Sequence, residues 1–292
     1  MIEALDHVII LVEDLEAATR SYAALLGREA SWSGAHPGYG TSNALFRLDN
    51  TYIELLTADG EGPVADQVRA ALRSGGEGPF GLAFRTPDAE AAHTRLSAAG
   101  LEPQPPSDGG GVDARGGSER RWRNVLLSQE RTGGLFAFVI EHLSSAEALP
   151  MVAPAGDPAA AVHALDHVVI RSKDAEAAIG LFGEPGLGIR LALDKTAPEW
   201  GGRMLFYRVG GATVEVIAKS PPQTPQEGES LHSFWGIAYQ VADLQAAHRR
   251  LTEAEVAVSE VRQGRKPGTM VATVKSHVHG APTLLIGPDP AA

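Results

Sequence analysis

The feature that most constrains the fold is a short sequence pattern that occurs four times along the chain. The segments ALDHVII at 4–10 and ALDHVVI at 164–170 match almost residue for residue, and GLAF at 81–84 matches GIAY at 236–239. In every copy an Asp lies seven residues after a fixed reference position, and an Ala-Ala pair begins three residues after that Asp; the reference residues are His7, Gly81, His167 and Gly236. Internal repetition of this kind indicates four copies of one supersecondary unit.

Each copy predicts the same order of strands and helix. The short apolar runs are typical of strands, and the Asp stands where a helix N-cap accepts hydrogen bonds from free backbone N–H groups. Gly27 and Gly100 follow two of the predicted helices and are suited to end them. Further strand-like runs follow each helix, and the helix can cover only one face of the resulting sheet. The predicted fold class is therefore α+β, with four βαβββ modules paired into two cupped-sheet domains.

The two pairs of modules predict two domains joined by a linker. The segment between them carries Pro150, Pro154 and Pro158 and shows neither strand nor helix periodicity, which is typical of a connection between domains. The predicted boundaries are 1–142 for the first domain (modules 1–75 and 76–142), 143–163 for the linker, and 164–292 for the second domain (modules 164–228 and 229–292).

The composition narrows the classes of partner. Of 292 residues, 43% are hydrophobic and 21% are charged, and the formal net charge is −11, so we expect the chain to bind neither nucleic acid nor anionic membrane surfaces. The absence of Cys removes disulfides, iron–sulfur clusters and thiolate metal sites. No apolar run approaches the ~20 residues of a membrane span, and the N-terminal residues lack the basic start of an export signal. We therefore expect a cytoplasmic protein, monomeric or homodimeric, whose partner is a small molecule.

A His and a Glu recur together in the first and third modules. His7 lies on the first predicted strand and Glu54 interrupts the apolar run TYIELLT, while His167 and Glu215 repeat the pair. Glu141 in FAFVIEH stands at what reads as the corresponding last-strand position of the second module. A carboxylate in an apolar strand is costly unless a cation or a hydrogen-bond donor answers it. Each pair is therefore either a pair of metal ligands or a buried, hydrogen-bonded couple.

These segments resemble the vicinal oxygen chelate superfamily, and within it the glyoxalase-like proteins. The resemblance rests on LDHVIILVEDLEAA, GAHPGYGTSNALF and TYIELL, and it covers about residues 4–142 and 164–287. It implies that paired βαβββ units form a glyoxalase-like cupped sheet around a divalent metal ion such as Zn, Mn, Ni or Fe. The first-strand His and the last-strand Glu are the usual ligand positions, so the implied metal ligands are His7, Glu54 and Glu141, with His167 and Glu215 as second-domain candidates.

The chain also departs from the pattern that the resemblance implies. Active members often carry a second His on the first strand of the partner module, but Gly81 and Gly236 stand at those positions. By this count the first domain retains three of four candidate ligands and the second domain retains two. The first domain is therefore predicted to hold the working site.

Two loops add candidate residues near the first-domain site. His36, in the segment 33–44, either replaces the missing imidazole or acts as a general base, or it is a turn residue beside Pro37 and Gly38. The Gly-rich stretch 108–121 reads either as a mobile lid or as a disordered loop. The candidates for substrate binding are Tyr39, Thr41, Asn43 and Arg123.

Two classes of function remain open. The first is a metal-dependent isomerase or lyase that transfers a proton on a small oxygen-bearing substrate, with Glu54, Glu141 or His36 as acid–base residues. An extradiol-type dioxygenase is a further form of this class, although it normally uses two His and one carboxylate. In the second class the cup binds or sequesters a small molecule without metal, as antibiotic-resistance relatives do. Candidate stacking residues in the second domain are then Trp200, Phe234 and Trp235.

Overall fold

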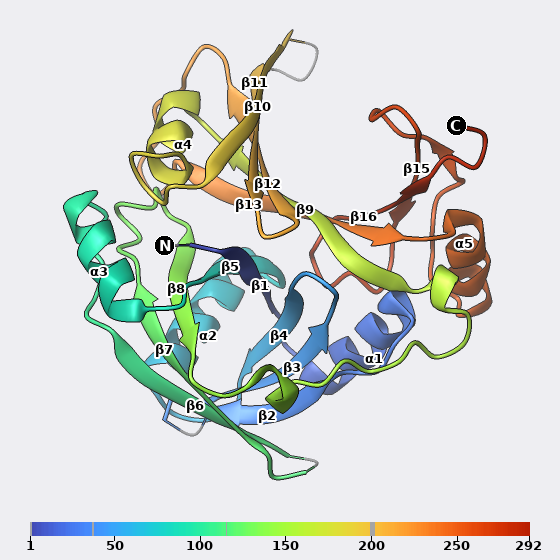
Figure 1. Ribbon diagram of the computed structural model, residues 1–292, viewed down its shortest axis with the longest axis horizontal. Helices are drawn as coiled ribbons and strands as arrows, with labels where there is room; N and C mark the ends of the chain where they lie inside the picture. Colours follow the sequence, from blue (N-terminus) through green and yellow to red (C-terminus); the bar gives the residue numbers. More distant parts are fainter. Residues whose placement is uncertain (1, 37, 115, 199–201) are drawn as a thin grey trace.

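The computed structural model describes residues 2–36, 38–114, 116–198 and 202–292 and contains two sheet domains (Figure 1). Each domain pairs two βαβββ modules, so the predicted α+β fold class is confirmed. None of the helices within these ranges combines the length and the apolar composition that a membrane span requires.

The first domain is a closed eight-stranded barrel. Its first module consists of β1 (Ala4–Leu11), α1 (Leu15–Leu26), β2 (Trp32–His36), β3 (Thr41–Arg47) and β4 (Tyr52–Ala58). Its second module consists of β5 (Gly78–Arg85), α3 (Ala89–Ala98), β6 (Ser107–Asp113), β7 (Glu119–Leu126) and β8 (Phe136–His142). The strand order is β1-β4-β3-β2-β6-β7-β8-β5, and the pairing of β2 with β6 closes the barrel. Closure leaves one interior, lined by alternate residues of the strands.

The second domain repeats this order of elements in an open sheet. Its modules contain β9 (Val162–Ser172), α4 (Ala175–Phe182), β10 (Arg190–Ala197), β11 (Gly202–Val209) and β12 (Ala212–Lys219), and then β13 (His232–Val241), α5 (Leu244–Glu253), β14 (Arg262–Gln263), β15 (Thr269–Val274) and β16 (Thr283–Pro288). The strand order β10-β11-β12-β9-β13-β16-β15-β14 leaves β10 and β14 as edges. The short 3₁₀ segments Ala146–Ala148 and Pro158–Ala160 lie between the two domains along the chain.

The four repeated Asp residues are N-caps, as the repeat predicts. The Oδ1 atoms of Asp14, Asp88 and Asp243 each accept a hydrogen bond of 2.9 Å from the backbone N–H three residues later, and Asp174 accepts from Glu176 at 2.8 Å. Gly27 and Gly100 follow their helices with φ of 72° and 75°, a left-handed conformation that favours glycine. The repeated pattern therefore fixes where each helix begins.

Most described residues of the Gly-rich stretch form β6 and the start of β7, so this part is neither a lid nor a disordered loop. The glycines make room for a tryptophan. A Cβ atom added to Gly109 would lie 2.2 Å from Nε1 of Trp122, since the indole of Trp122 lies across this part of β6. The composition that suggested flexibility instead allows an aromatic side chain to lie flat against the neighbouring strand.

A helix that the repeat did not predict closes one end of the barrel. Helix α2 (Pro63–Gly75) follows β4, with Pro63 in its first turn, where the missing N–H of proline costs nothing. Val68 of α2 is buried in a cluster with Ile9, Phe138 and other side chains that point into the barrel. The interior is therefore covered at this end and is not an open channel.

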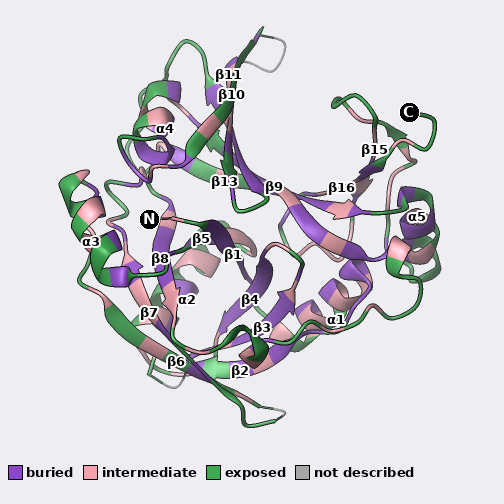
Figure 2. Cartoon of the chain, in the orientation of Figure 1, coloured by how far each residue is buried: buried purple, intermediate pink, exposed green. Residues whose placement is uncertain are grey.

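The main hydrophobic core lies between the two domains, outside the barrel interior. Strand β1 is buried along its whole length, whereas β10 is mostly exposed (Figure 2). The core residues of β1 and β9 belong to one continuous cluster, which includes Leu5, Val8, Ile10, Leu165, Val168 and Ile170. Arg250 of α5 adds polar contacts, because its guanidinium donates to the carbonyls of Ala24 and Leu25 at the end of α1. The two domains thus share one core, while His7 and Ile9 of β1 face the barrel interior.

Candidate active site in the first barrel

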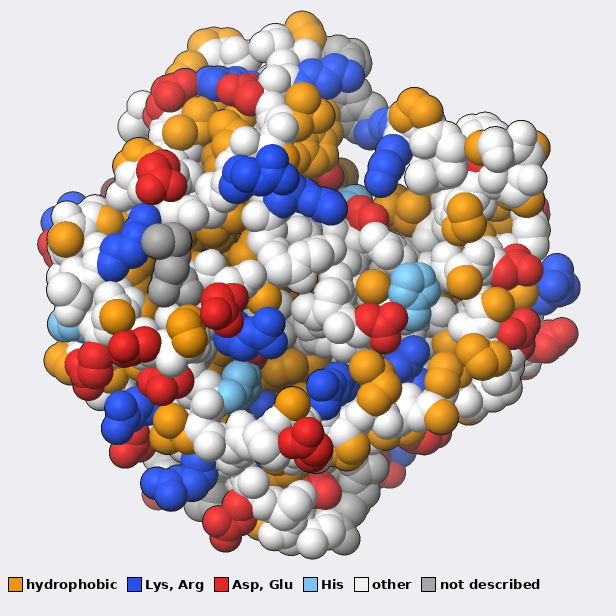
Figure 3. All heavy atoms as spheres, viewed as in Figure 1, with side chains coloured by type: hydrophobic (Ala, Val, Ile, Leu, Met, Phe, Trp, Pro, Cys, Tyr) orange, Lys and Arg blue, Asp and Glu red, His pale blue; other side chains and the backbone are white. Residues whose placement is uncertain are grey.

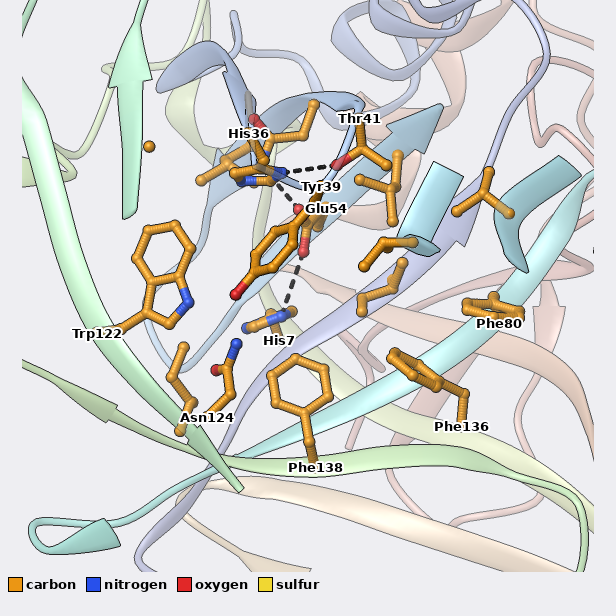
Figure 4. A pocket seen from close by; sticks show the side chains of 18 of the residues that line it. His7, His36, Tyr39, Thr41, Glu54, Phe80, Trp122, Asn124, Phe136 and Phe138 are labelled. Carbon is orange, nitrogen blue, oxygen red and sulfur yellow. Dashed lines mark hydrogen bonds and ion pairs between the residues drawn. The ribbon is translucent and has the colours of Figure 1, made fainter. Parts of the chain in front are cut away.

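The barrel interior holds a cavity of about 190 Å³. Strand alternation determines which side chains reach it. Along β7, for example, Arg120, Trp122 and Asn124 line the cavity, and the residues between them do not. The predicted candidates that line this one cavity are His7, His36, Tyr39, Thr41, Asn43 and Glu54. Most of the remaining lining is apolar or aromatic, and Phe80, Phe136 and Phe138 lie along one side (Figure 4).

His7 is held by two carboxylates. Its Nδ1 lies 2.7 Å from Oδ1 of Asp6, and its Nε2 lies 3.3 Å from Oε2 of Glu54. Burial alone would lower the pKa of His7, but the hydrogen bonds to Asp6 and Glu54 outweigh it and raise the pKa. The ring also stacks on Tyr52, with centroids 4.5 Å apart. These contacts therefore favour the imidazolium form of His7 and fix the orientation of its ring.

Glu54 is ionised in the same network. Burial would raise its pKa, yet the contact with His7 and the hydrogen bond from Asn43 bring the pKa from 4.5 to about 2. Nδ2 of Asn43 donates to Oε1 of Glu54 at 2.7 Å. Asp6 is ionised as well, because His142 and His7 bond to it and lower its pKa despite burial. The carboxylates at this end of the cavity therefore remain anionic well below neutral pH.

His36 has the opposite character. Burial lowers its pKa, so the imidazole is neutral at pH 7. Its Nε2 lies 3.4 Å from Nδ2 of Asn43, and its Nδ1 lies 3.0 Å from Oγ1 of Thr41. Because an amide nitrogen can only donate, Nε2 carries the lone pair, and Nδ1 carries the proton that is donated to Thr41. In Figure 4 Glu54 lies between the rings of His36 and His7. The cavity thus contains two imidazoles whose pKa values are shifted in opposite directions, and Asn43 and Glu54 link them.

Two predicted site residues do not reach the cavity. Oε2 of Glu141 accepts a hydrogen bond of 3.0 Å from the backbone N–H of Ala89 at the start of α3. Arg123 is exposed and pairs with Asp108 at 3.1 Å. Each follows directly in sequence a residue that faces the interior, Ile140 and Trp122 respectively, so alternation directs both away from it. The structure does not bring Glu141 together with His7 and Glu54 as a ligand set.

The strand register explains the error over Glu141. In the first module Glu54 pairs with Ile9, two residues after His7. In the second module Phe138 pairs with Ala83, two residues after Gly81. The position equivalent to Glu54 is therefore that of Phe138, three residues before Glu141. The same relationship in the second domain joins Glu215 to Val169 and Leu284 to Ala238. Each domain thus retains two of the four expected ligand positions, and the predicted count of three for the first domain is wrong.

The second domain repeats the His–Glu pair on a more exposed surface. His167 bonds to Asp166 at 2.7 Å and lies 3.4 Å from Glu215. Its side chain is 18% exposed, compared with 3% for His7. Burial raises the pKa of Glu215, whereas that of Glu54 is lowered. Between the two arms of this domain the surface is visibly hollowed (Figure 3). The pair is therefore kept in both domains, but only the first domain encloses it.

The stacking residues suggested for the second domain do not form one surface within the described residues. Trp200 lies outside them. Phe234 packs partly buried against the main core. Trp235 is 38% exposed, and the guanidinium of Arg171 lies 4.4 Å from its ring centroid. These positions therefore supply no shared aromatic wall comparable to that in the first barrel.

Several residues that line or support the cavity were not predicted from the sequence. Arg120, Tyr52 and Asn124 line it, and Asp6 orients His7 from behind. The buried oxygens Oδ1 of Asn43 and Oδ1 of Asn124 have no hydrogen-bond partner in the described structure. Alternation along β7 and β4 could have identified Arg120 and Tyr52, because both lie an even number of residues from cavity-lining positions. The unpartnered oxygens indicate that a bound molecule or water supplies donors here.

Comparison with known proteins identifies the family. A family model described as glyoxalase-like domain matches residues 5–181, which is more than half of the chain. A second model, the glyoxalase/bleomycin resistance protein/dioxygenase superfamily, matches residues 164–278. The chain belongs to the glyoxalase-like family. The vicinal oxygen chelate superfamily that the sequence resembles is thereby confirmed.

Individual relatives of this glyoxalase-like protein extend the comparison. An ethylmalonyl-CoA/methylmalonyl-CoA epimerase of Cereibacter sphaeroides is 38% identical over 101 residues, which are 34% of this chain and 73% of that protein. A mutant of 4-hydroxymandelate synthase from Streptomyces coelicolor superposes with a TM-score of 0.68 at 16% identity, covering 99% of this chain and 94% of that chain. A hypothetical protein from Staphylococcus aureus superposes with a TM-score of 0.65 at 12% identity, covering 97% and 98%. The solved structures share the fold.

Divalent metal ions are common in this superfamily. The question for the glyoxalase-like barrel is whether the side chains at its four ligand positions can hold such an ion. Of the four equivalent positions, His7 and Glu54 carry donors, Gly81 has no side chain, and Phe138 carries a phenyl ring. The described residues contain no cluster of three or more His, Asp or Glu side chains that could hold a metal ion. The two donors that remain are paired with each other. This arrangement does not fit a divalent ion held by protein ligands alone.

Proposed function

We propose that the chain is an enzyme that transfers a proton to or from a small, largely apolar molecule bound in the first barrel, with His36 as the base. The observation that carries this proposal is the state of His36. It is a neutral, buried imidazole whose Nε2 lone pair faces Asn43 and the cavity. A neutral imidazole is the most effective general base that a protein offers near pH 7, and the 3.4 Å contact from Asn43 gives way when Nε2 takes a proton.

The carboxylates are weaker candidates for the base. Glu54 has a pKa of about 2, so it binds a proton poorly at neutral pH. Glu141 lies outside the cavity and accepts a backbone hydrogen bond at the start of α3. In this proposal Glu54 instead fixes His7 and Asn43, and the positive charge of His7 stabilises negative charge that develops on the substrate.

For a substrate with a carbonyl group, the proton transfer begins at His36. Nε2 of His36 takes a proton from the carbon next to the carbonyl, the C–H bond breaks, and its electron pair moves to give an enolate. The amide oxygens of Asn43 and Asn124 orient the substrate by accepting hydrogen bonds from its donor groups. Return of a proton from His36 to the same face exchanges the hydrogen with solvent, and addition of a solvent-derived proton to the opposite face of the same carbon inverts its configuration, which is an epimerisation. No step passes through a metal ion, since the donor set does not fit one.

The relatives support this class of chemistry. The Cereibacter sphaeroides relative is by name an epimerase, and epimerisation at carbon entails removing and returning a proton. That likeness covers about a third of this chain, so the substrate of the relative does not carry over. An extradiol-type dioxygenase is not proposed, because the described residues contain no cluster that would form its two-His, one-carboxylate ligand set.

A second candidate function is binding without turnover. The apolar wall favours it, since Phe136 and Phe138 occupy much of the second-module side of the cavity. Such a pocket could sequester a small aromatic molecule through stacking and burial alone. The two candidates differ in one respect that is directly measurable: only an enzyme exchanges the hydrogens of a bound molecule with solvent.

Hydrogen–deuterium exchange tests the proposal. Phenylpyruvate and phenylacetone each carry one ring and a carbonyl with acidic neighbouring C–H groups, and their exchange in D₂O is followed by NMR. We expect the protein to accelerate exchange of at least one probe, and His36→Gln to reduce that acceleration by about 10²- to 10⁴-fold. His167→Gln in the second domain is the matched control and should leave the rate unchanged. Binding of both probes without accelerated exchange would favour the passive pocket.

A further inference from the structure

Arg120 is a buried cation inside the cavity. It lies on β7, where it alternates inward with Trp122 and Asn124, and it is 7% exposed. The neighbouring residue on the outer face, Arg123, is exposed and paired with Asp108. The same strand thus carries two arginines on its outer face, Arg121 and Arg123, and one, Arg120, that faces the proposed substrate.

Three aromatic rings surround the guanidinium. Its Cζ lies 5.6 Å from the ring centroid of Trp32, 5.4 Å from that of Tyr52 and 5.9 Å from that of Trp122. Cation–π contacts at these distances stabilise the charge and restrict its position. The hydroxyl of Tyr52 accepts one hydrogen bond from Arg120. The five N–H groups of a guanidinium are therefore only partly satisfied by these partners.

No carboxylate among the described residues forms an ion pair with Arg120, although Asp6 and Glu54 lie in the same network of residues around the cavity. The buried Arg28 offers a contrast, because it donates to the backbone carbonyl of Val162 at 2.7 Å. A buried charge without a counter-charge is costly. The unpaired guanidinium therefore indicates that the ligand of this cavity supplies the negative charge.

The indole of Trp122 lies beside both Arg120 and His36, because its ring centroid is 5.9 Å from Cζ of Arg120 and 5.7 Å from the ring centroid of His36. A Cβ atom on Gly111 would lie 3.4 Å from Trp122, 3.5 Å from His36 and 3.6 Å from Trp32. Gly111 itself lines the cavity. The charge of Arg120 also contributes to lowering the pKa of His36, after burial. An anion bound at Arg120 would thus lie near the proposed base, because both residues line this cavity and border the same indole.

We propose that Arg120 binds the carboxylate of the substrate, and that the substrate is a small monocarboxylic acid with a single-ring or similar apolar body. The assignment of a carboxylate group rests on the contacts of Arg120. The claim that the bound acid undergoes proton transfer rests on the proposed function. The carboxylate takes the place of the missing counter-ion, in the bidentate manner that arginine favours. The apolar body lies against Phe80, Phe136 and Phe138. Since a cavity of about 150 Å³ accommodates benzene, a volume of about 190 Å³ limits the body to about one ring.

Binding of benzoate and benzamide tests the assignment directly. The two molecules have the same ring and nearly the same shape, and only benzoate is charged. We expect the protein to bind benzoate at least about 10-fold more tightly than benzamide by isothermal titration calorimetry, because a hydrogen bond to a charged group is worth about 1.5–3 kcal/mol. Equal affinities for the two molecules would overturn the proposal, and this comparison requires no variant.

Two variants of Arg120 and one control sharpen the test. Arg120→Gln should weaken benzoate binding by about 10- to 100-fold and leave benzamide binding nearly unchanged. Arg120→Lys should restore part of the affinity, since the charge returns without the planar fork. Arg123→Gln is the matched control on the outer face and should change neither affinity. An equal loss of both ligands in Arg120→Gln would assign Arg120 a structural role and contradict the proposal.

The outcomes separate this inference from the proposed function. Charge-selective binding without any hydrogen exchange would leave Arg120 as the carboxylate anchor and remove the enzyme. Exchange of neutral phenylacetone that is as fast as that of phenylpyruvate, and insensitive to Arg120→Gln, would keep the enzyme and remove the anchor. The anchor and the base are therefore independent claims about the same cavity.

Discussion

Phe138 of β8 lies at the barrel position equivalent to that of Glu54 on β4, and its ring centroid is 5.6 Å from that of His7. The two modules of the first domain have thus diverged across one cavity. The polar groups are His7, His36 and Glu54 of the first module and Arg120 and Asn124 of the second, while the phenyl rings come from β5 and β8 of the second module. A small molecule with one polar end and one apolar end matches this division.

The Glu54 network makes a contribution to stability that depends on pH. The pKa of Glu54 falls from 4.5 to about 2 on folding, so its stabilisation is present above pH 4.5 and is lost as the pH falls toward 2. The shift corresponds to roughly 3 kcal/mol. We expect Glu54→Gln to lower the free energy of unfolding in urea at about pH 6. The difference from the unmodified protein should shrink steadily when the measurement is repeated at about pH 3.

Glu215→Gln is the control, with the opposite sign. Burial raises the pKa of Glu215, so its ionised form disfavours the folded state as the pH rises above 4.5. Its replacement should therefore leave stability at neutral pH unchanged or increased. Equal losses of stability in the two variants would show that the two His–Glu pairs do not differ in the way described.

Gly109 is predicted to be required for the packing of Trp122 against β6. A Cβ atom there would lie 2.2 Å from Nε1 of Trp122, so Gly109→Ala must displace the indole. We expect a loss of about 1–3 kcal/mol in thermal or chemical denaturation and a change in tryptophan fluorescence. Gly110→Ala is the neighbouring control, because its Cβ would meet only the carbonyl of Arg120 at 3.4 Å. Identical behaviour of the two variants would contradict the packing described for Trp122.

The pH dependence of deuterium exchange should reflect the protonation of His36. Burial lowers its pKa below the ordinary 6.5, and the neutral form is the active base. The rate of catalysed deuterium exchange should therefore be flat across neutral pH and fall only below pH 6.5, as His36 becomes protonated. An acidic limb that lies above pH 6.5 would point to a different base.

The repeat predicted much of the fold because its signals are local. Asp14 and its three equivalents cap helices through contacts that span a few residues, and each apolar run lies within a single strand. Helix α2 lies outside the repeated unit, so the repeat carries no information about it. The Gly-rich stretch was misread because its glycines serve a contact with Trp122 on another strand, which composition does not reveal.

The candidate site was predicted in part for a similar reason. His7 and Glu54 recur as a pair in the second domain, and both line the cavity. Glu141 was chosen from its place near the end of a strand, but register depends on pairing between β5 and β8, which places Phe138 there instead. Arg123 differs from Arg120 in the direction its side chain takes from the same strand. The pairing with the partner strand was the missing information for Glu141, whereas alternation along β7 itself separates Arg123 from Arg120.

The most direct test of the central claim combines metal analysis with exchange in one sample. The protein is dialysed against a chelator, its residual metal is measured by mass spectrometry, and its catalysis of deuterium exchange is recorded before and after addition of Zn²⁺, Mn²⁺, Ni²⁺ or Fe²⁺. We predict that the protein accelerates exchange of a probe with far less than one metal ion per chain, and that this acceleration is lost in His36→Gln. Exchange that requires one divalent ion per chain, and disappears together with that ion in His7→Ala, would contradict this prediction.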